Sequence, residues 1–237
     1  MSPADDANFC FPVRPDLLAN DRLKLVPMTP TRHASAFFRA SSPHPDIYAH
    51  MPTGPFATES EFINFLDEKR SDPTVLILAI IDKTRPPSPE DDEGALAGMM
   101  SFFDTSPVHL SAEIGYVVTL PAFRRTHVTT NSVGLMLRYA FAAGGMGLRR
   151  VQWKASSVNA ASMRVAERMG FRREGVLRWH MVFRDGVGKG KVGHGRALPK
   201  GSREGELGRD TVVLGFCWDE WEGGGEERVV KLMGRVE

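Results

Sequence analysis

The segment FRRTHVTTNS, residues 123–132, combines residue types that can hold an anion. It follows a strand-like run, AEIGYVV, and precedes a helix-like run, VGLMLRYAFAAGG. A helix N-terminus presents unpaired backbone N–H groups and the positive end of its dipole. The bend adds guanidinium and hydroxyl groups, from Arg124, Arg125, Thr126, Thr129 and Thr130. It could therefore hold a pyrophosphate, although a capped helix with solvated arginines would have the same composition.

Hydrophobic periodicity predicts the two elements that position this bend. Alternation over residues 109–118 predicts a strand with one face formed by Ala112, Ile114, Tyr116 and Val118 and the other by Ser111, Glu113, Gly115 and Val117. After the bend, helical spacing relates Val133, Met136, Leu137, Ala140 and Phe141. This helix is expected to pack one face on the sheet and to end at Gly144 and Gly145.

The rest of the chain predicts further strands and helices in a mixed α/β arrangement. Strands are predicted over 22–27, 74–82, 94–104, 148–156, 171–183 and 210–221. Helices are predicted over 30–41, 58–71 and 159–170. Thr58 and Glu61 form a capping box, and Asn159 is the N-cap of a helix that Gly170 ends.

Three segments are predicted to be irregular. Residues 42–57 contain four prolines and Gly54, which indicates a loop with buried aromatic residues. The prolines and acids near 83–94 indicate a solvated connection between strands. Residues 184–210 hold eight glycines and seven Lys or Arg residues, which is typical of a flexible loop.

Composition excludes several classes of protein. A chain of 237 residues with 42% hydrophobic content can bury one core, and a net charge of +1 gives no field that favours nucleic acid or a membrane surface. Cys10 and Cys217 lack metal-ligand spacing, so no metal site is expected and a reducing compartment is favoured. The N-terminus is acidic, and the run VLILAII is too short to span a membrane. We expect a soluble, cytoplasmic protein.

Two longer stretches, EIGYVV…LPAFRRTHVTT and VQWKASSVNAASMRVAERMGFRREGVLR, are similar to the GCN5-related N-acetyltransferase (GNAT) superfamily. The closest resemblance is to its Rim-type, or ribosomal-protein-alanine acetyltransferase-like, branch, which acetylates ribosomal-protein N-termini and many small amines. The resemblance extends from about Arg22 to Trp221 and is strongest from Glu113 to Arg178. It implies the α/β (α+β) GNAT fold, a mixed central sheet of about six to seven strands, splayed in the middle and flanked by about four helices. It also implies one domain over 22–221, with flexible insertions at about 83–94 and 184–210, an extension over 1–21 and a tail over 222–237.

The resemblance implies that acetyl-CoA is the co-substrate. The pyrophosphate-loop pattern Gln/Arg-x-x-Gly-x-Gly/Ala falls on Arg124, His127 and Thr129, so the leading arginine fits and the two small positions do not. One branch of the Rim-type set shares a closing motif that falls here on Arg209, Asp210, Thr211, Glu220 and Trp221. The residues expected to contact acetyl-CoA are Val117, Val118, Arg124, Arg125, Thr126, His127, Val128, Thr129, Thr130 and Asn159. Asn159 can also cap its helix, because capping uses the side-chain oxygen and leaves the NH₂ group free.

Two residues are candidates for catalysis, each with a structural alternative. Glu113 shares its predicted strand face with Gly115 and Val117, beside the splay where family members deprotonate the amine directly or through water. It is equally compatible with a surface carboxylate. Ser162 stands where the Rim-type pattern has a serine and could donate a hydrogen bond to the departing thiolate, or could be a small inward residue chosen for packing. The tyrosine acid of many family members is replaced by Ala166.

The acceptor side is expected to be formed by a loop and a strand. By resemblance, the residues concerned are Tyr48, His50, Met51, Phe56, Arg178, Trp179 and His180. For the aromatic residues among them, packing in the core is the alternative. The identity of the acceptor depends on these loops and is not specified by the sequence.

We therefore predict an acetyl-CoA-dependent N-acetyltransferase that acts on a primary amine of a small molecule or a peptide N-terminus. Neither cysteine lies in the matched site, which favours direct attack in a ternary complex over an acyl-enzyme. The expected partner is the amine alone, without nucleic acid or membrane, and the protein is expected to be a monomer or a homodimer. A non-catalytic acetyl-CoA sensor or scaffold on the same fold is the alternative function.

Two other functions are disfavoured by the sequence. GKGKVG, residues 188–193, matches the dinucleotide pattern G-x-G-x-x-G, but Pro199 and Gly201 stand where the following helix would be. Nucleic-acid binding by 184–210 would require interleaved aromatic residues, which this segment lacks.

Overall fold

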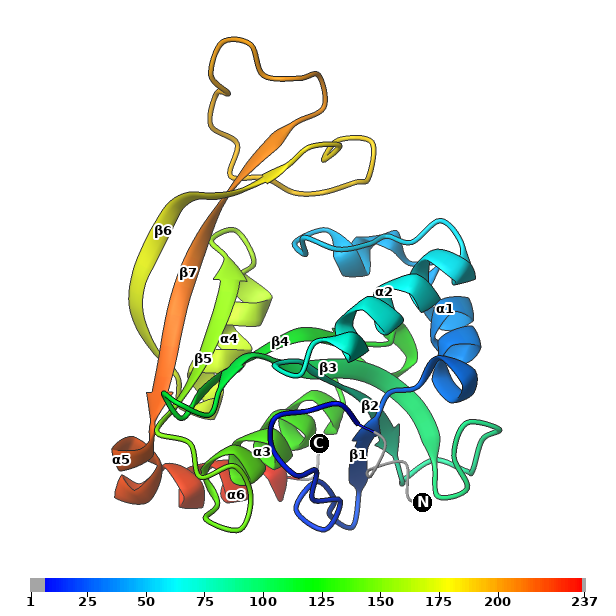
Figure 1. Ribbon diagram of the computed structural model, residues 1–237, viewed down its shortest axis with the longest axis vertical. Coiled ribbons are helices and arrows are strands. Elements are labelled where there is room, and N and C mark those ends of the chain that lie inside the picture. The colour runs from blue at the N-terminus through cyan, green and yellow to red at the C-terminus, as the bar shows by residue number, and fades with distance from the viewer. Residues whose placement is uncertain (1–6, 236–237) are drawn as a thin grey trace.

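The computed structural model describes residues 7–235, built around one seven-stranded sheet of order β1-β2-β3-β4-β5-β7-β6 (Figure 1). The strands are β1 (Leu23–Pro27), β2 (Leu76–Asp82), β3 (Ala95–Ser106), β4 (Ser111–Thr119), β5 (Arg150–Ser156), β6 (Arg172–Phe183) and β7 (Leu207–Cys217). Neighbouring strands are antiparallel, except β4 and β5, which are parallel. The mixed sheet of six to seven strands is confirmed. The first six residues of the 1–21 extension and the last two of the 222–237 tail lie outside the described residues.

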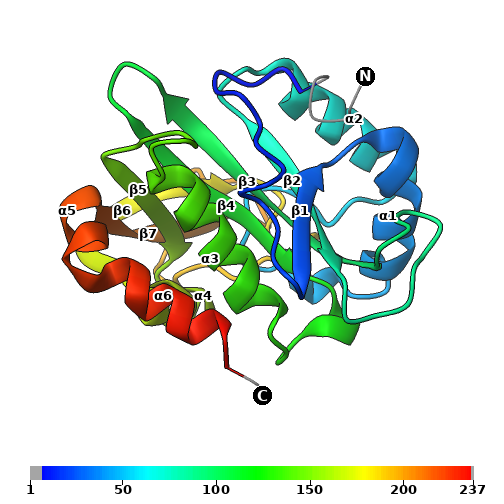
Figure 2. The same ribbon diagram turned by 90° about the horizontal axis from the view of Figure 1, so that it is seen from below.

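Helices cover both faces of the sheet. They are α1 (Ser35–Ser41), α2 (Glu59–Ser71), α3 (Val128–Phe141), α4 (Ala160–Met169), α5 (Trp218–Glu220) and α6 (Glu226–Met233), with short helical segments η1 (Pro30–Ala34), η2 (Pro45–Tyr48), η3 (Pro121–Phe123) and η4 (Trp221–Gly225). Helices α3 and α6 lie side by side on one face, and α1 and α2 on the other (Figures 1 and 2). The four predicted helices are present. None of the described helices is long and apolar enough to cross a membrane.

The uninterrupted apolar run of β2 is explained by burial on both faces. Leu76, Leu78 and Ile80 contact the core under α3, whereas Ile77 and Ile81 contact the core under α1 and α2. A strand covered on both sides needs no polar face, so alternation disappears from its sequence. Burying each such side chain contributes about 1.5–3 kcal/mol to the free energy of unfolding.

The expected C-terminal tail contains a packed helix. Val229, Leu232 and Met233 of α6 are buried, and Asn131 of α3 donates a hydrogen bond to the carbonyl of Met233 at 3.3 Å. A Cβ added to Gly134 of α3 would lie 2.3 Å from the Met233 sulfur, so any larger residue there would displace the Met233 side chain. The tail therefore completes the core that supports α3.

The predicted splay is present between β4 and β5. The two strands pair only from Ser111 with Arg150 to Glu113 with Gln152, and the pairing then stops. Beyond this point β4 bends, because it contains an extra residue. Tyr116 has a positive φ of 48° and creates a bulge.

This bulge overturns the predicted alternation of β4. Tyr116 and Val118 pack against the core under α2, whereas Val117 packs on the opposite side with Ile114. The predicted faces hold as far as Gly115 and are wrong after it, because one additional residue exchanges the two faces.

The β6–β7 hairpin extends beyond the body of the protein (Figure 1). Strand β7 begins at Leu207 and ends at Cys217, so the last four residues of the expected 184–210 loop belong to a strand, and the predicted strand end at 221 is helical. The loop is also packed at Lys191, whose Nζ donates hydrogen bonds to the carbonyls of Tyr48, Met51 and Thr53 at 2.9, 2.9 and 2.8 Å. Composition predicts a flexible loop, but the buried Lys191 side chain holds this part of the loop against the 42–57 loop.

Candidate active site

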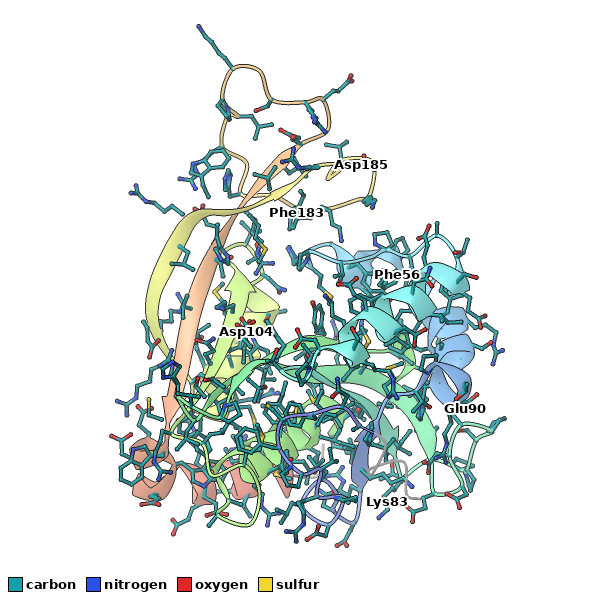
Figure 3. All side chains as sticks on the ribbon, viewed as in Figure 1. Phe56, Lys83, Glu90, Asp104, Phe183 and Asp185 are labelled. Carbon is teal, nitrogen blue, oxygen red and sulfur yellow. The ribbon has the colours of Figure 1, made fainter. Side chains whose placement is uncertain are left out.

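A cavity of about 560 Å³ opens where β4 and β5 separate. Its walls are formed by these strands, the start of α3, α4, the 42–57 loop and the β6–β7 hairpin. Asp104, at its rim, lies near the middle of the molecule in Figure 3. Of the predicted site residues, the cavity is lined by His50, Met51, Glu113, Val117, Val118, Arg124, Thr129, Asn159, Ser162 and His180.

Five residues of the predicted pyrophosphate loop lie outside this lining. Val128 is buried in the core, and His127 Nε2 lies 3.3 Å from Asp82 Oδ1 on the interior side. The hydroxyls of Thr126 and Thr130 are engaged by Phe123 and Arg168. Arg125 is exposed and has a positive φ of 61°. The side chains that line the cavity in this bend are those of Arg124 and Thr129.

Four predicted acceptor-side residues also lie outside the lining. The Tyr48 hydroxyl donates to Ser41 Oγ at 3.2 Å, and the rings of Tyr48 and Phe56 are in edge contact. Core packing therefore explains these two aromatic residues. Trp179 has a positive φ of 53° and packs on the ring of His194, and Arg178 beside it is exposed.

Glu113 is the buried acid of the cavity. It is the last β4 residue that pairs with β5, and its side chain is 3% exposed. The prediction of a surface carboxylate is therefore wrong. Its Oε2 lies 2.6 Å from Lys154 Nζ and 3.5 Å from Gln152 Nε2. Burial raises the pKa of Glu113 to about 7, and the Lys154 ammonium opposes this effect only in part. A carboxyl group with such a pKa can accept a proton at neutral pH.

Ser162 lies in the first turn of α4 on the other side of the cavity. Its Oγ accepts a hydrogen bond from Trp153 Nε1 at 2.9 Å. Because the indole N–H can only donate, the hydroxyl proton of Ser162 stays available for another acceptor. The hydrogen bond from Trp153 fixes the position of the Ser162 Oγ. A residue chosen only for its small size would not need such a hydrogen bond.

Asn159 combines a cap with a free donor, as predicted. Its Oδ1 accepts a hydrogen bond from the Ser162 N–H at 3.1 Å and caps α4. Within residues 7–235, its side-chain NH₂ has no hydrogen-bond partner, and Asn159 lines the cavity. The geometry leaves this NH₂ group free to bind a carbonyl of a ligand.

The start of α3 provides an anion site at one end of the cavity. The first hydrogen bond inside the helix is donated by Asn131 N, so the N–H groups of Thr129 and Thr130 have no acceptor within the helix. Arg124 adds a guanidinium that is half exposed and 3.3 Å from Asp46. The Thr129 hydroxyl is 2.8 Å from that of Thr119, which links α3 to the end of β4.

The bend departs from the small-residue pattern at His127 and Thr129, and Thr129 lines the cavity. The His127 side chain is turned into the interior, toward Asp82, and does not obstruct the helix N-terminus. Arg125 adopts the left-handed conformation that is uncommon for residues other than glycine. The backbone thus achieves the bend without glycine, and backbone N–H groups remain accessible beside Arg124.

The residues that line or contact the site without having been predicted as site residues include Gln152, Lys154 and Arg209. Gln152 and Lys154 could have been found, since alternation over β5 places them on one face and the parallel register places that face beside Glu113. Arg209 was noted only as part of the closing motif. Its position depends on a bulge in β6, where Leu177 pairs with Thr211 but Met181 pairs with Arg209. No local pattern predicts this bulge.

Among residues 7–235, no group of three or more His, Cys, Asp or Glu side chains is arranged to hold a metal ion. The polar groups of the cavity include the Glu113–Lys154 ion pair and the Ser162 hydroxyl, which accepts a hydrogen bond from the Trp153 indole. The N-terminus of α3 adds backbone N–H groups. This set can bind an anion at one end and transfer a proton at the other.

A mixed sheet splayed between two parallel strands, with a bulge beside the splay and a cavity at their separation, defines the GNAT fold class. Residues 22–172 match the family model described as an acetyltransferase (GNAT) domain, and the chain belongs to this family.

Individual relatives agree with this assignment. The chain is 34% identical over 90 residues to the uncharacterized N-acetyltransferase YoaA of Bacillus subtilis. This alignment covers 38% of this chain and 49% of the length of YoaA. A GCN5-related N-acetyltransferase from Brucella melitensis superposes with a TM-score of 0.72 at 26% identity, covering 92% of this chain and 85% of that structure. RimJ of Mycobacterium smegmatis, solved in complex with CoA-disulfide, has a TM-score of 0.65 at 18% identity over 88% of each chain, and this likeness shows the fold alone.

Proposed function

We propose that this protein transfers the acetyl group of acetyl-CoA to a primary amine, on a small molecule or a peptide N-terminus, in a ternary complex of the Rim type. The observation that carries this proposal is that Glu113 and Ser162 line one cavity from opposite sides of the splay. One residue is suited to take a proton from the amine and the other to donate a hydrogen bond to the leaving group. Membership of the acetyltransferase family and a neighbour solved with CoA-disulfide support the choice of donor.

The binding groups divide the cavity into two ends. The donor end comprises Arg124, the N–H groups at the start of α3 and the free NH₂ of Asn159. The acceptor end comprises Glu113, His50 and His180. When bound, acetyl-CoA supplies a thioester whose carbonyl carbon the amine attacks directly.

Glu113 acts first in the proposed reaction. An amine attacks only in its neutral form, and a carboxylate with a pKa of about 7 accepts the ammonium proton near neutral pH. Proton transfer neutralises Glu113 and leaves Lys154 as the cation beside it, 2.6 Å away. The new C–N bond then forms as the C–S bond breaks, and the second proton that the amine nitrogen loses is taken up by the departing thiolate.

Ser162 acts on the leaving group. The Trp153 indole occupies one lone pair of the Ser162 Oγ, so the hydroxyl proton can be directed into the cavity. A thiol of pKa near 8.5 leaves as a thiolate with little assistance, and one donated hydrogen bond is sufficient help. The tyrosine common in the family is not needed at Ala166, whose side chain is buried in the core.

The experiment that tests the proposal is incubation of the full chain with acetyl-CoA and a pooled library of amines and peptides. Free thiol release and a mass increase of one acetyl group on a library member are expected. Binding of CoA without either signal would assign the protein to the alternative, a non-catalytic sensor. Absence of CoA binding in calorimetry would overturn both.

A further inference from the structure

Arg209 is a buried cation that forms no ion pair with the described part of the chain. The residue is 4% exposed, lies on β7 and lines the acceptor end of the cavity. Its Nη1 donates to the His50 carbonyl at 3.2 Å, and its buried Nε has no hydrogen-bond partner. Among residues 7–235, no carboxylate oxygen lies within 4 Å of its guanidinium.

The nearby acids are engaged elsewhere. Glu113 is paired with Lys154 at 2.6 Å, and Asp104 at the rim lies 3.6 Å from the same ammonium. Asp210, the next residue in β7, points to the opposite side of the strand, where it contacts Arg196 and accepts a hydrogen bond from Trp179 N. None of these carboxylates forms an ion pair with Arg209.

The other polar groups around Arg209 do not supply negative charge. Burial and the Arg209 charge lower the pKa of both His50 and His180, which favours their neutral forms. The Nδ1 of His50 is buried without a partner, and the Nδ1 of His180 lies 3.0 Å from Thr211 Oγ1. Glu113 therefore acts on Arg209 through its charge without forming an ion pair, and the guanidinium at the acceptor end keeps a donor free for a ligand carboxylate.

An unpaired guanidinium is costly to bury, and guanidinium groups bind carboxylates with good geometry. We propose that Arg209 binds a carboxylate of the acceptor, so that the substrate class is a small amino carboxylate, with its amine toward Glu113. This inference rests on the proposed function, because it assigns the acceptor of the same cavity. The ammonium and the carboxylate of one molecule would then face Glu113 and Arg209 respectively.

The test compares amino acids as free acids with the same amino acids as carboxamides. Each matched pair has the same side chain and amine and differs only at the carboxyl group. For the parent protein with acetyl-CoA, we expect kcat/KM to be at least tenfold higher for the preferred acid than for its amide. In the presence of CoA, the same acid should raise the melting temperature and its amide should not.

Arg209→Gln should abolish this preference, because glutamine carries no charge. Arg209→Lys keeps the positive charge and should retain part of the preference for the acid. It replaces the glutamine variant as the test if that variant folds poorly. Arg196→Gln removes a guanidinium from the other side of β7 and should leave the acid-to-amide ratio unchanged.

Two outcomes with acetyl-CoA would overturn the inference while leaving the acetyltransferase proposal intact. One is equal turnover of acids and amides by the parent protein. The other is an Arg209→Gln variant that lowers kcat/KM for both by the same factor, as a structural residue would. Turnover with succinyl-CoA on neutral amines that depends on Arg209 would place the carboxylate on the acyl group and also overturn it. Failure of every amine, with no CoA binding, would reject the proposed function itself.

Discussion

Lys154 Nζ lies 2.6 Å from Glu113 Oε2 at the point where β4 and β5 separate. Glu113 and Gln152 form the last pair of the parallel ladder, and Lys154 is two residues further along β5, on the same face as Gln152. The ion pair thus bridges the opening of the splay. It places the proposed base beside a cation that tunes its affinity for protons.

The first prediction is that Glu113→Gln lowers kcat by about a hundredfold and leaves the affinity for acetyl-CoA nearly unchanged. Glutamine has the same shape but cannot accept the amine proton. Steady-state kinetics and calorimetric titration with CoA measure the two quantities. Normal turnover by this variant would assign deprotonation to ordered water or to His50, and His180 would be tested next.

The second prediction concerns the pH dependence of kcat/KM. The base acts only when ionised, so activity should fall as pH decreases through the pKa of Glu113, about 7. Lys154 lowers this pKa, so Lys154→Met should move the acidic limb to higher pH. Asp104 raises it, so Asp104→Asn should move the limb to lower pH.

These two variants change the same profile in opposite directions, which separates electrostatic tuning from a general loss of folding. An acidic limb that stays in place in both variants would show that another group titrates.

The third prediction separates the two functions of Asn159. Serine is also a favourable N-cap but has no NH₂ group, so Asn159→Ser should keep the melting temperature of the parent protein. Its Kd for CoA should rise by about tenfold, as expected for one lost hydrogen bond of about 1.4 kcal/mol. Asn159→Ala, which loses both functions, should be destabilised as well. Unchanged CoA affinity in the serine variant would limit Asn159 to capping.

The sequence predicted those parts of the site that depend on local pattern. Asn159 and Ser162 lie at the start of a helix with a strong N-cap, and the helix after the bend follows from apolar spacing. Their positions in the structure agree with prediction because periodicity and capping are local properties.

Long-range features were not predictable in this way. The Tyr116 bulge exchanges the faces of β4, and its left-handed residue is a tyrosine rather than the adjacent Gly115, so alternation alone did not place it. Likewise, composition indicated a flexible loop over 184–210, because a lysine that is buried against carbonyls of a distant loop cannot be told from a solvated lysine by its sequence.

The fourth prediction concerns Ser162 and its indole partner. Ser162→Ala should lower kcat by about tenfold and leave KM for the amine similar, since the lost hydrogen bond is formed with the leaving group. It also leaves the part-buried Trp153 N–H without an acceptor, which costs about 1–3 kcal/mol of stability if no water replaces it. Trp153→Phe removes the indole donor and keeps the hydroxyl, so its kcat should be affected less. Equal kcat in the alanine variant and the parent protein would leave packing as the explanation for Ser162.

The last prediction is that Lys191 positions the acceptor side of the cavity. Phe183 and Asp185 mark where β6 enters the 184–206 loop (Figure 3). Lys191 of this loop donates hydrogen bonds to carbonyls of the 42–57 loop, which also carries His50 and Met51. Burial lowers the pKa of Lys191 to about 8, which keeps the ammonium dominant at pH 7, where its three N–H groups match three carbonyls.

Lys191→Met leaves these carbonyls without a donor, so the 42–57 loop should become more accessible to protease and KM for the amine should rise by about tenfold. The Kd for CoA should not change, because the donor end lies at α3 and α4. Lys189→Met, on an exposed side chain of the same loop, is the matched control and should behave as the parent protein. Limited proteolysis with mass mapping and amine titration measure both effects. If Lys191→Met leaves protease accessibility and KM unchanged, the contact contributes nothing to acceptor binding.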